Sequence, residues 1–326
     1  MHFQKRISWL LVLSVAVGLL PGTSGAQDYP SRPIKVVVGF PPGGGTDVAA
    51  RIVTQEMSKG LGQPFLIENK PGAAGTLGAA EAARSAPDGY TLLVTPGGHA
   101  IFGAIFKSLP FHSVNSFDWI SNIITIPFFI VVPAGSEFKN LADVVAKAKA
   151  EPGTIAFGST GPGSTHHLGI ELLGSRTGVK FLHVPYRGDA PIITALLASE
   201  IHFSIVTPTQ AIENVKAGKF RALAVTSNTR YAGLPEVPTV EQTLAISNFD
   251  LRSWFAIAAP SGTPKSVIDR LNVEVRKAVD VPEVKARLVA MGGEPAAGTP
   301  EAMRERVASE LATWTKTVDD ASIAKQ

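Results

Sequence analysis

The 326-residue chain contains no cysteine, and only 17% of its residues are charged and 7% aromatic. Without cysteine the chain forms no disulfides, no thiolate metal centre and no thiol redox site, and it has no residue to carry a lipoprotein anchor. Hydrophobic residues make up 45% of the chain, which excludes intrinsic disorder and collagen-like structure. A chain of this length usually divides into two domains.

The sequence also lacks a hydrophobic run long enough for a membrane span. The apolar run 7–20 has 14 residues, fewer than the roughly 20 that cross a bilayer. Lys5 and Arg6 precede it and Ser24-Gly25-Ala26 follow it, which is the pattern of a secretory signal peptide. We expect cleavage after Ala26 and export to the periplasm without lipidation; an uncleaved anchor is the alternative.

The net charge is small once the signal peptide is considered. The formal charge of +3 falls to +1 when Lys5 and Arg6 leave with residues 1–26. Such a balance excludes the basic footprint of a nucleic-acid-binding protein. Attraction for an anionic ligand must therefore come from backbone N–H groups and helix ends.

Short β-branched runs alternate with longer helical patterns along the mature chain, which predicts parallel sheets flanked by helices. The pattern restarts after residue 125, so we expect an α/β protein of two lobes, each a mostly parallel sheet with helices. Lobe 1 is predicted from 27–125 plus 250–326 and lobe 2 from 126–249. Strands are predicted at 34–40, 65–68, 90–94, 128–132, 155–157, 180–184, 201–206 and 222–225, and helices at 47–61, 76–85, 141–150, 166–177, 190–199 and 210–217, with a helical tail at 264–321 that packs on lobe 1.

Two glycine-rich loops, one per predicted lobe, lie between a strand and a helix. The first is 40–47, with Thr46 or Asp47 placed to cap the helix, and the second is 158–165. Each allows backbone N–H groups at a helix N-terminus to approach an anion. The first loop has neither the Gly-Lys-Ser/Thr ending of a nucleotide-binding P-loop nor a G-x-G-x-x-G pattern, so no nucleotide cofactor is expected.

Other polar motifs are weaker signals. The loop 95–99 follows a predicted strand, and Arg187 either clamps a carboxylate or pairs with Asp189. His166 and His167 face different sides of a helix and lack further ligands at metal-binding spacing, so no metal site is expected. Ser164 is not followed by the glycine of a G-x-S-x-G nucleophile elbow, and no enzyme activity is expected. The tryptophans Trp119, Trp254 and Trp314 are predicted to lie in the core.

Together these segments resemble the solute receptors of tripartite tricarboxylate transporters, also called the Bug family, over essentially the whole mature chain. The resemblance rests on ordered motifs: Tyr29-Pro30-Ser31-Arg32-Pro33-Ile34, Pro41-Pro42-Gly43-Gly44-Gly45-Thr46-Asp47, Glu68-Asn69-Lys70-Pro71-Gly72-Ala73-Ala74-Gly75, Pro87-Asp88-Gly89-Tyr90-Thr91-Leu92, Val184-Pro185-Tyr186-Arg187-Gly188, Trp254-Phe255, Ala259-Pro260-Ser261-Gly262-Thr263-Pro264 and Gly298-Thr299-Pro300-Glu301.

The resemblance implies a periplasmic binding protein of type II-like fold that closes on a small organic acid, without a cofactor or metal. It places one ligand carboxylate between the two glycine-rich loops, with the neighbouring loops reading the rest of the ligand. The implied ligand-binding residues are Phe40, Pro42, Gly43, Gly44, Thr46, Asp47, Thr95, Gly97, Ser159, Thr160, Gly163, Ser164, Thr165, Gly188, Asp189 and Ala190.

The chain departs from the family pattern at two acidic positions. The helix after Gly188 often carries an aspartate where Ala195 stands, and a later strand often ends in an acid where Val206-Thr207 stands. These differences disfavour an ammonium-bearing ligand, so we expect a di- or monocarboxylate.

We expect a monomer that delivers its ligand to integral-membrane permease subunits. The alternatives are a sensory module that presents the ligand to a membrane histidine kinase, an exported hydrolase and a structural partner protein.

Overall fold

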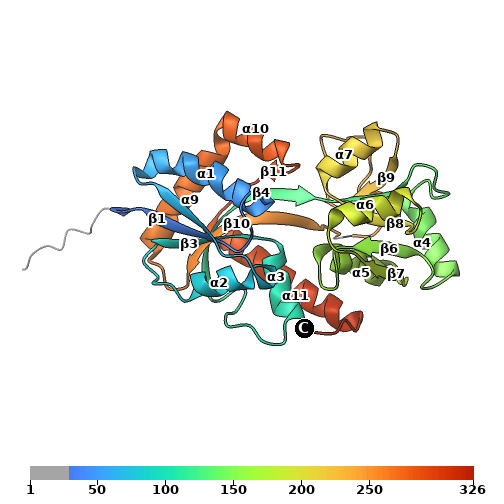
Figure 1. Ribbon diagram of the computed structural model, residues 1–326, viewed down its shortest axis with the longest axis horizontal. Helices are drawn as coiled ribbons and strands as arrows, with labels where there is room; N and C mark the ends of the chain where they lie inside the picture. The colour runs from blue at the N-terminus through green and yellow to red at the C-terminus, as the bar shows by residue number, and fades with distance from the viewer. Residues whose placement is uncertain (1–28, 248) are drawn as a thin grey trace, which may run out of the picture.

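The computed structural model describes residues 29–247 and 249–326 as two lobes joined by two long strands (Figure 1). The predicted signal peptide at 1–26 lies outside the described residues. Each lobe is a sheet with helices on both faces, so the predicted two-lobed α/β fold is confirmed. Among the described helices, none combines the length and apolar character that crossing a membrane requires.

Lobe 1 is built on a six-stranded sheet with the order β11-β4-β10-β3-β1-β2. Alternate side chains of β1 enter two different cores, because Ile34, Val36 and Val38 pack with α1 and α9, whereas Val37 packs with α2 and α3. A strand covered on both faces is hydrophobic throughout, as this one is. The strands are β1 (Ile34–Val38), β2 (Phe65–Asn69), β3 (Thr91–Pro96), β4 (Phe117–Pro127), β10 (Arg252–Pro260) and β11 (Glu294–Pro295), and the helices are α1 (Gly45–Leu61), α2 (Thr76–Ala83), α3 (Gly98–Ile105), α9 (Lys265–Asp280), α10 (Pro282–Ala290) and α11 (Pro300–Asp320), with a short 3-10 turn, η1 (Ala73–Gly75).

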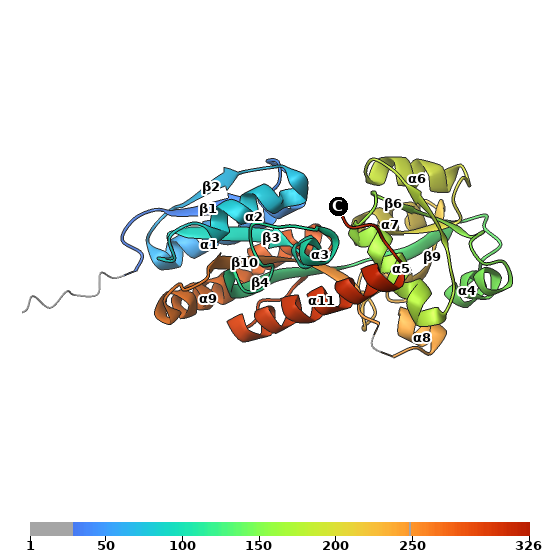
Figure 2. The same ribbon diagram turned by 90° about the horizontal axis from the view of Figure 1, so that it is seen from below.

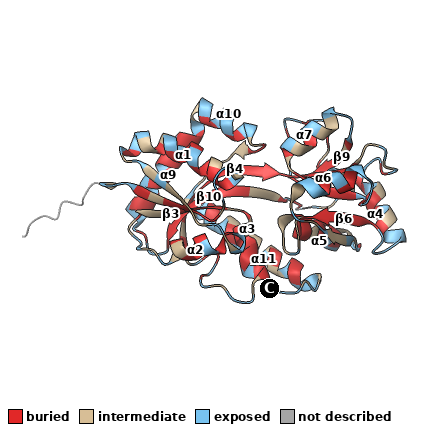
Figure 3. Cartoon of the chain, in the orientation of Figure 1, coloured by how far each residue is buried: buried red, intermediate tan, exposed pale blue. Residues whose placement is uncertain are grey.

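Lobe 2 has a five-stranded sheet with the order β7-β6-β8-β5-β9. The inner strands β5, β6 and β8 are almost entirely buried, whereas the edge strand β7 is partly exposed, and exposed residues lie along the helices (Figure 3). The strands are β5 (Phe129–Pro133), β6 (Ala156–Ser159), β7 (Leu182–Pro185), β8 (Phe203–Val206) and β9 (Phe220–Val225), and the helices are α4 (Leu141–Ala150), α5 (Thr165–Thr177), α6 (Asp189–Leu197), α7 (Pro208–Lys216) and α8 (Val240–Leu244).

Both sheets are mixed rather than mostly parallel, which corrects one detail of the prediction. Parallel pairing is confined to β2-β1-β3 in lobe 1 and β7-β6-β8 in lobe 2. The strand that enters lobe 2, β4, pairs antiparallel with β10, the strand that returns. The difference arises because a chain that leaves a lobe and comes back must run in opposite directions.

Thr226 ties the two crossing segments together where they enter lobe 2. Its buried hydroxyl oxygen accepts a hydrogen bond from the Phe128 N–H at 2.9 Å and lies 2.6 Å from the Leu251 carbonyl oxygen, to which it donates. The Leu251 N–H in turn donates to the Thr226 carbonyl at 2.9 Å. The two chain crossings are therefore held side by side between the lobes.

Trp254 of β10 lies in the core beside these two chain crossings. Its indole N–H lies 2.9 Å from both carboxylate oxygens of Glu310 on α11, and its ring meets that of Trp119 edge-on at 5.9 Å. Arg306 donates to Glu310 at 2.8 Å, while burial raises the pKa of the Glu310 carboxyl. Trp119, Trp254 and Trp314 are all buried, as predicted.

The tail is helical, as predicted, and it forms three helices, α9, α10 and α11, with the short strand β11 between the last two. In α9 the buried residues include Val267, Ile268, Leu271 and Val275, which recur at helical spacing and face the sheet. The last helix, α11, contacts α3 and β4 of lobe 1 and also α5 of lobe 2 (Figure 2). The tail therefore packs on lobe 1, as expected, and in addition reaches across to the second lobe.

Candidate functional site

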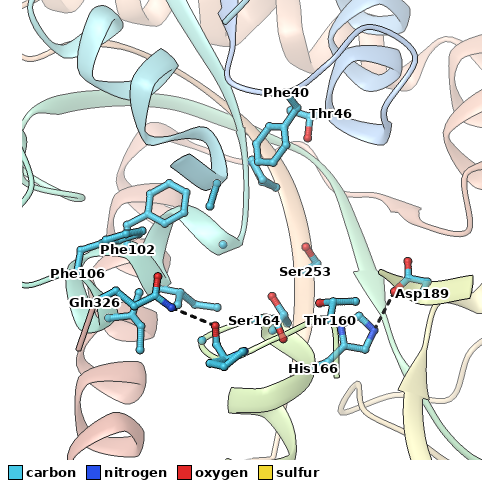
Figure 4. Close-up of a pocket in the computed structure, with 18 of the residues that line it drawn as sticks. Phe40, Thr46, Phe102, Phe106, Thr160, Ser164, His166, Asp189, Ser253 and Gln326 are labelled. Carbon is cyan, nitrogen blue, oxygen red and sulfur yellow. Dashed lines mark hydrogen bonds and ion pairs between the residues drawn. The ribbon is translucent and has the colours of Figure 1, made fainter. Parts of the chain in front are cut away.

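A cleft of about 590 Å³ lies between the lobes, at the ends of strands from both sheets (Figure 4). This volume lies within the range of small-molecule sites. Lobe 1 contributes Phe40, Thr46, Ala74, Pro96, Gly98, Ile101, Phe102, Ile105, Phe106, Ser253 and Gln326, and lobe 2 contributes Phe128, Thr160, Pro162, Gly163, Ser164, Thr165, His166 and Asp189.

The first glycine-rich loop joins β1 to α1 and lies on the lobe 1 side of the cleft. The residue that caps the helix is Gly44, in an extended conformation and without a side-chain bond, which corrects the expectation that Thr46 or Asp47 is the cap. Gly43 adopts a φ of +79°, in the left-handed region that glycine tolerates best. Thr46 is left to face the cleft.

Asp47 lies behind this loop, with only 2% of its surface exposed. Its carboxylate accepts hydrogen bonds at 2.9 Å from the Gly43 N–H, from Nε of Arg51 and from Nδ2 of Asn69. The hydrogen bond from Arg51, with those from Gly43 and Asn69, lowers the pKa of Asp47 to about 2 despite burial. Asp47 therefore fixes the loop from behind and does not line the cleft.

The second glycine-rich loop joins β6 to α5 and repeats the first in geometry. Gly163 has a φ of +75°, and the capping residue Ser164 has φ −70° and ψ 161°, the same values as Gly44. The Ser164 hydroxyl accepts from the His167 N–H at 3.2 Å, so the predicted cap of this helix is present. The Gly163 N–H donates to Nδ1 of His167 at 3.1 Å, just as the Gly43 N–H donates to Asp47.

These two helix starts present backbone donors to the same cleft. Within the described chain, the N–H groups of Gly45 and Thr46 in α1 and of Thr165 and His166 in α5 have no hydrogen-bond partner. The first N–H groups of any helix lack partners inside it and carry positive partial charge. Thr46 and Thr165 both line the cleft, so a helix start from each lobe borders it, and helix starts of this kind favour anions.

Ser159 does not face the cleft. It is fully buried, and its hydroxyl oxygen lies 2.5 Å from Nε2 of His183 and accepts from the Gly161 N–H at 3.0 Å. The His183 ring stacks on His167 with their centroids 3.8 Å apart. Burial, with a smaller contribution from His183, lowers the pKa of His167 to about 4, so His167 remains a neutral acceptor for Gly163. This group of side chains shapes the second loop from behind.

The loop after β3 is also held from behind. Thr95 is buried, and the Gly97 N–H donates to the Trp254 carbonyl at 2.8 Å, which leaves Pro96 and Gly98 to line the cleft. His99 is fully buried with Nε2 at 2.9 Å from the Ser113 carbonyl oxygen, and burial lowers its pKa to about 4.

The loop before α6 supplies a single acid to the cleft. Gly188, with a φ of +103°, precedes the helix, and Asp189 is its first residue. Oδ1 of Asp189 lies 3.6 Å from Nε2 of His166, and no described ion pair joins Asp189 to Arg187. Ala190 is exposed and does not line the cleft.

The predicted ligand-binding residues thus divide into two groups. Those on the cleft wall are Phe40, Thr46, Thr160, Gly163, Ser164, Thr165 and Asp189, and those that lie beside or behind it are Pro42, Gly43, Gly44, Asp47, Thr95, Gly97, Ser159, Gly188 and Ala190. The sequence prediction missed the apolar wall formed by Ile101, Phe102, Ile105 and Phe106 of α3 and its end. It also missed His166 as a wall residue. Apolar residues at positions i, i+1, i+4 and i+5 were the available signal for α3.

No metal is expected here, and the described residues contain no group of three histidine, aspartate or glutamate side chains arranged to hold one. His166 and His167 point to different surroundings, the cleft and the buried side of the loop respectively.

The chain is similar to known proteins over most of its length. Residues 49–323 match the family model described as the tripartite tricarboxylate transporter family receptor. Protein BugT of Bordetella pertussis is 34% identical over 310 residues, which cover 93% of this chain and 95% of BugT. The structure of the periplasmic binding protein BugD is similar with a TM-score of 0.72 at 31% identity, covering 91% of this chain and 100% of BugD. The R. palustris protein Rpa4515, solved with adipate, has a TM-score of 0.74 at 32% identity, with 91% and 99% covered.

Proposed function

We infer the function from one premise: this chain belongs to the tripartite tricarboxylate transporter receptor family. We propose that it captures a small organic acid, a mono- or dicarboxylate, in the cleft between its lobes. It then delivers the acid to integral-membrane permease subunits. It works in the periplasm as a free, non-lipidated monomer, with residues 27–125 plus 250–326 as one functional lobe and 126–249 as the other.

The observation that carries this proposal is the pair of helix starts that face one cleft from opposite lobes. A carboxylate has two oxygens and about four acceptor positions, enough to engage the N–H groups of both α1 and α5. The Ser164 hydroxyl accepts from His167 and keeps its own hydrogen to donate to the ligand. The adipate bound to the R. palustris relative is an acid of this class.

Ligand capture closes the protein because the ligand bonds to both lobes at once. A ligand shifts a conformational equilibrium only by its differential affinity for the two states. In an open form a carboxylate meets the donors of one lobe, and in a closed form it meets those of both. The paired strands β4 and β10 and the Thr226 contacts form the hinge for this motion.

The experiment that tests this function combines released-ligand analysis with calorimetry. The purified protein is denatured, and released small molecules are identified by mass spectrometry; we expect a carboxylic acid. The ligand-free protein is then titrated with a panel of mono- and dicarboxylates. If no acid is released and none of the panel binds, the proposed function is wrong.

Ser164→Ala and Asn140→Ala form a matched pair for locating the site. Both residues cap a helix of lobe 2, and losing either cap costs about 1 kcal/mol of stability. Only Ser164 lines the cleft, and losing a hydrogen bond to a charged ligand raises the Kd about 10- to 150-fold. Equal affinities in the two variants would remove Ser164 from the site.

A further inference from the structure

Among the described residues of the cleft wall, one has a carboxyl or basic aliphatic side chain. Asp189 is an acid, and neither lysine nor arginine lines the cleft. One carboxylate oxygen of Asp189, Oδ1, is buried and accepts no hydrogen bond. The Asp189 side chain as a whole is 44% exposed, so the carboxyl group keeps contact with solvent, while Oδ1 is left free to accept a hydrogen bond from a ligand donor.

His166 stands beside Asp189 and is also without a hydrogen-bond partner for its ring in the described chain. Only 8% of the surface of His166 is exposed, and this residue lines the cleft. Its ring lies edge-on to that of Phe128, with the ring centroids 5.7 Å apart. Its Nε2 lies 3.6 Å from Oδ1 of Asp189, which is beyond hydrogen-bonding distance. Figure 4 shows both side chains on one side of the cleft.

The histidine does not cancel the charge of the acid. Burial lowers the pKa of His166, and Asp189 opposes this effect without reversing it. The imidazole is therefore neutral at neutral pH and offers one acceptor nitrogen. The pair has a net negative charge and an excess of acceptors, which is complementary to a cation with several N–H donors.

The remaining walls of the cleft offer two further kinds of contact to a ligand. Thr46 and Ser164 mark the helix starts that present donors to a carboxylate, and Phe102 and Phe106 form an apolar wall on the side of the cleft opposite Asp189 (Figure 4). A compact ligand that uses all three kinds of contact has three groups on one central atom. These are a carboxylate for the helix starts, a cationic donor group for the acid and histidine pair, and an apolar side chain for the apolar wall.

We propose that Asp189 and His166 form a subsite for the ammonium group of the ligand, and that the cleft takes an α-amino acid with an apolar side chain. This inference rests on the proposed carboxylate capture and narrows it. It reverses the expectation that Ala195 and Val206-Thr207 argue against an ammonium group, because the acid stands at Asp189 instead. A second carboxylate near Asp189 is disfavoured by like charge.

The test is calorimetry on the ligand-free full-length mature protein with three ligands of one shape. These are L-phenylalanine, 3-phenyllactate and 3-phenylpropanoate, which carry an ammonium, a hydroxyl or a hydrogen at related positions, and adipate serves as the dicarboxylate. We expect phenylalanine to bind about 10- to 150-fold more tightly than phenylpropanoate, the range for a charge-assisted hydrogen bond. The inference is overturned if phenylalanine binds no more tightly than either analogue.

Asp189→Asn separates recognition from structure. It removes the charge with little change of size, so phenylalanine should bind at least tenfold more weakly, while phenylpropanoate is unchanged and adipate binds more tightly. Glu200→Gln is the matched control, because it removes a negative charge from an exposed position of lobe 2 outside the cleft. Equal losses for every ligand would show a structural role and overturn the proposal. Asp189→Ser provides a second charge-free variant if Asp189→Asn does not fold.

The outcome also distinguishes this inference from the proposed function. If adipate or another acid of the panel binds and phenylalanine does not, the amino-acid subsite is wrong and carboxylate capture stands. If no carboxylate binds, both are wrong.

Discussion

Asp47 offers a direct test of how the first loop is held in place. The Asp47→Asn substitution replaces one carboxylate oxygen, either Oδ1 or Oδ2, with an NH₂ group. That group cannot accept the hydrogen bonds that the oxygen accepted, because it is itself a donor. Either the contacts to Gly43 and Arg51 or the contact to Asn69 is then lost. The pKa of Asp47 falls from 3.8 to about 2 in the folded protein. At about 1.4 kcal/mol per pKa unit, the ionised carboxylate contributes about 2 to 3 kcal/mol to the free energy of unfolding.

The sign of this contribution sets its pH dependence. Because folding lowers the pKa, the stabilisation is fully present above pH 3.8 and is lost as the pH falls towards 2. We therefore expect Asp47→Asn to be less stable than the wild type by about 2 to 3 kcal/mol at pH 7, with a difference that narrows towards zero as the pH falls to 2.

The measurement is urea unfolding followed by tryptophan fluorescence at several pH values. Asp269→Asn is the control, since Asp269 forms an exposed pair with Lys265 on α9 and its loss should change stability little. A gap between wild type and Asp47→Asn that stays constant from pH 7 to pH 2 would refute the electrostatic argument. The Asp47→Asn variant should also bind carboxylates more weakly, because the Gly43–Thr46 turn loses hydrogen bonds that hold it in place.

Three further changes test other parts of the structure. Gly163→Ala combines a strained φ of +75° with a Cβ 2.9 Å from the Ile105 side chain across the cleft, so calorimetry should show weaker ligand binding, partly restored by Ile105→Ala. Burial lowers the pKa of His99 from 6.5 to about 4, so the free energy of unfolding should fall by about 3 kcal/mol as the pH drops from above 6.5 to below 4, and His99→Gln should flatten that part of the plot of stability against pH. Trp254→Phe leaves Glu310 without its indole donor and should lower the free energy of unfolding by about 1–3 kcal/mol, measured by urea titration, whereas an unchanged value would mean that this bond is not stabilising.

The sequence predicted the strands and helices that carry their own periodic signal. The run Ile34–Val38 and the helix Gly45–Leu61 appear within two residues of their predicted bounds. The helix Gly98–Ile105 was not predicted, because it is short, begins in a glycine-rich turn and is buried on most of its surface, so it lacks a polar face. Strand direction was also beyond reach, since alternation of strands and helices does not reveal which strand crosses between lobes.

The candidate site was predicted at the level of its loops and not of its side chains. Both glycine-rich loops lie at the cleft, but whether a polar side chain faces the ligand or braces the loop depends on tertiary partners. Asp47 turns towards Arg51 and Asn69, and Ser159 turns towards His183, and these partners lie on other turns or strands. Asp189 was identified, but the sequence does not show that His166 rather than Arg187 is its neighbour. The ligand-binding assignments themselves stay predictions.

The partnerless N–H groups at the starts of α1 and α5 belong to the main chain, which no amino-acid substitution other than proline removes. Mutations can therefore tune this anion site but rarely delete it, whereas the walls that surround it are made of side chains and are free to change. A receptor built in this way can drift to a new ligand in single steps, each of which keeps some carboxylate affinity. Changes of specificity should therefore occur first in α3, His166 and Asp189, and only later in the two helix starts that we propose bind the carboxylate.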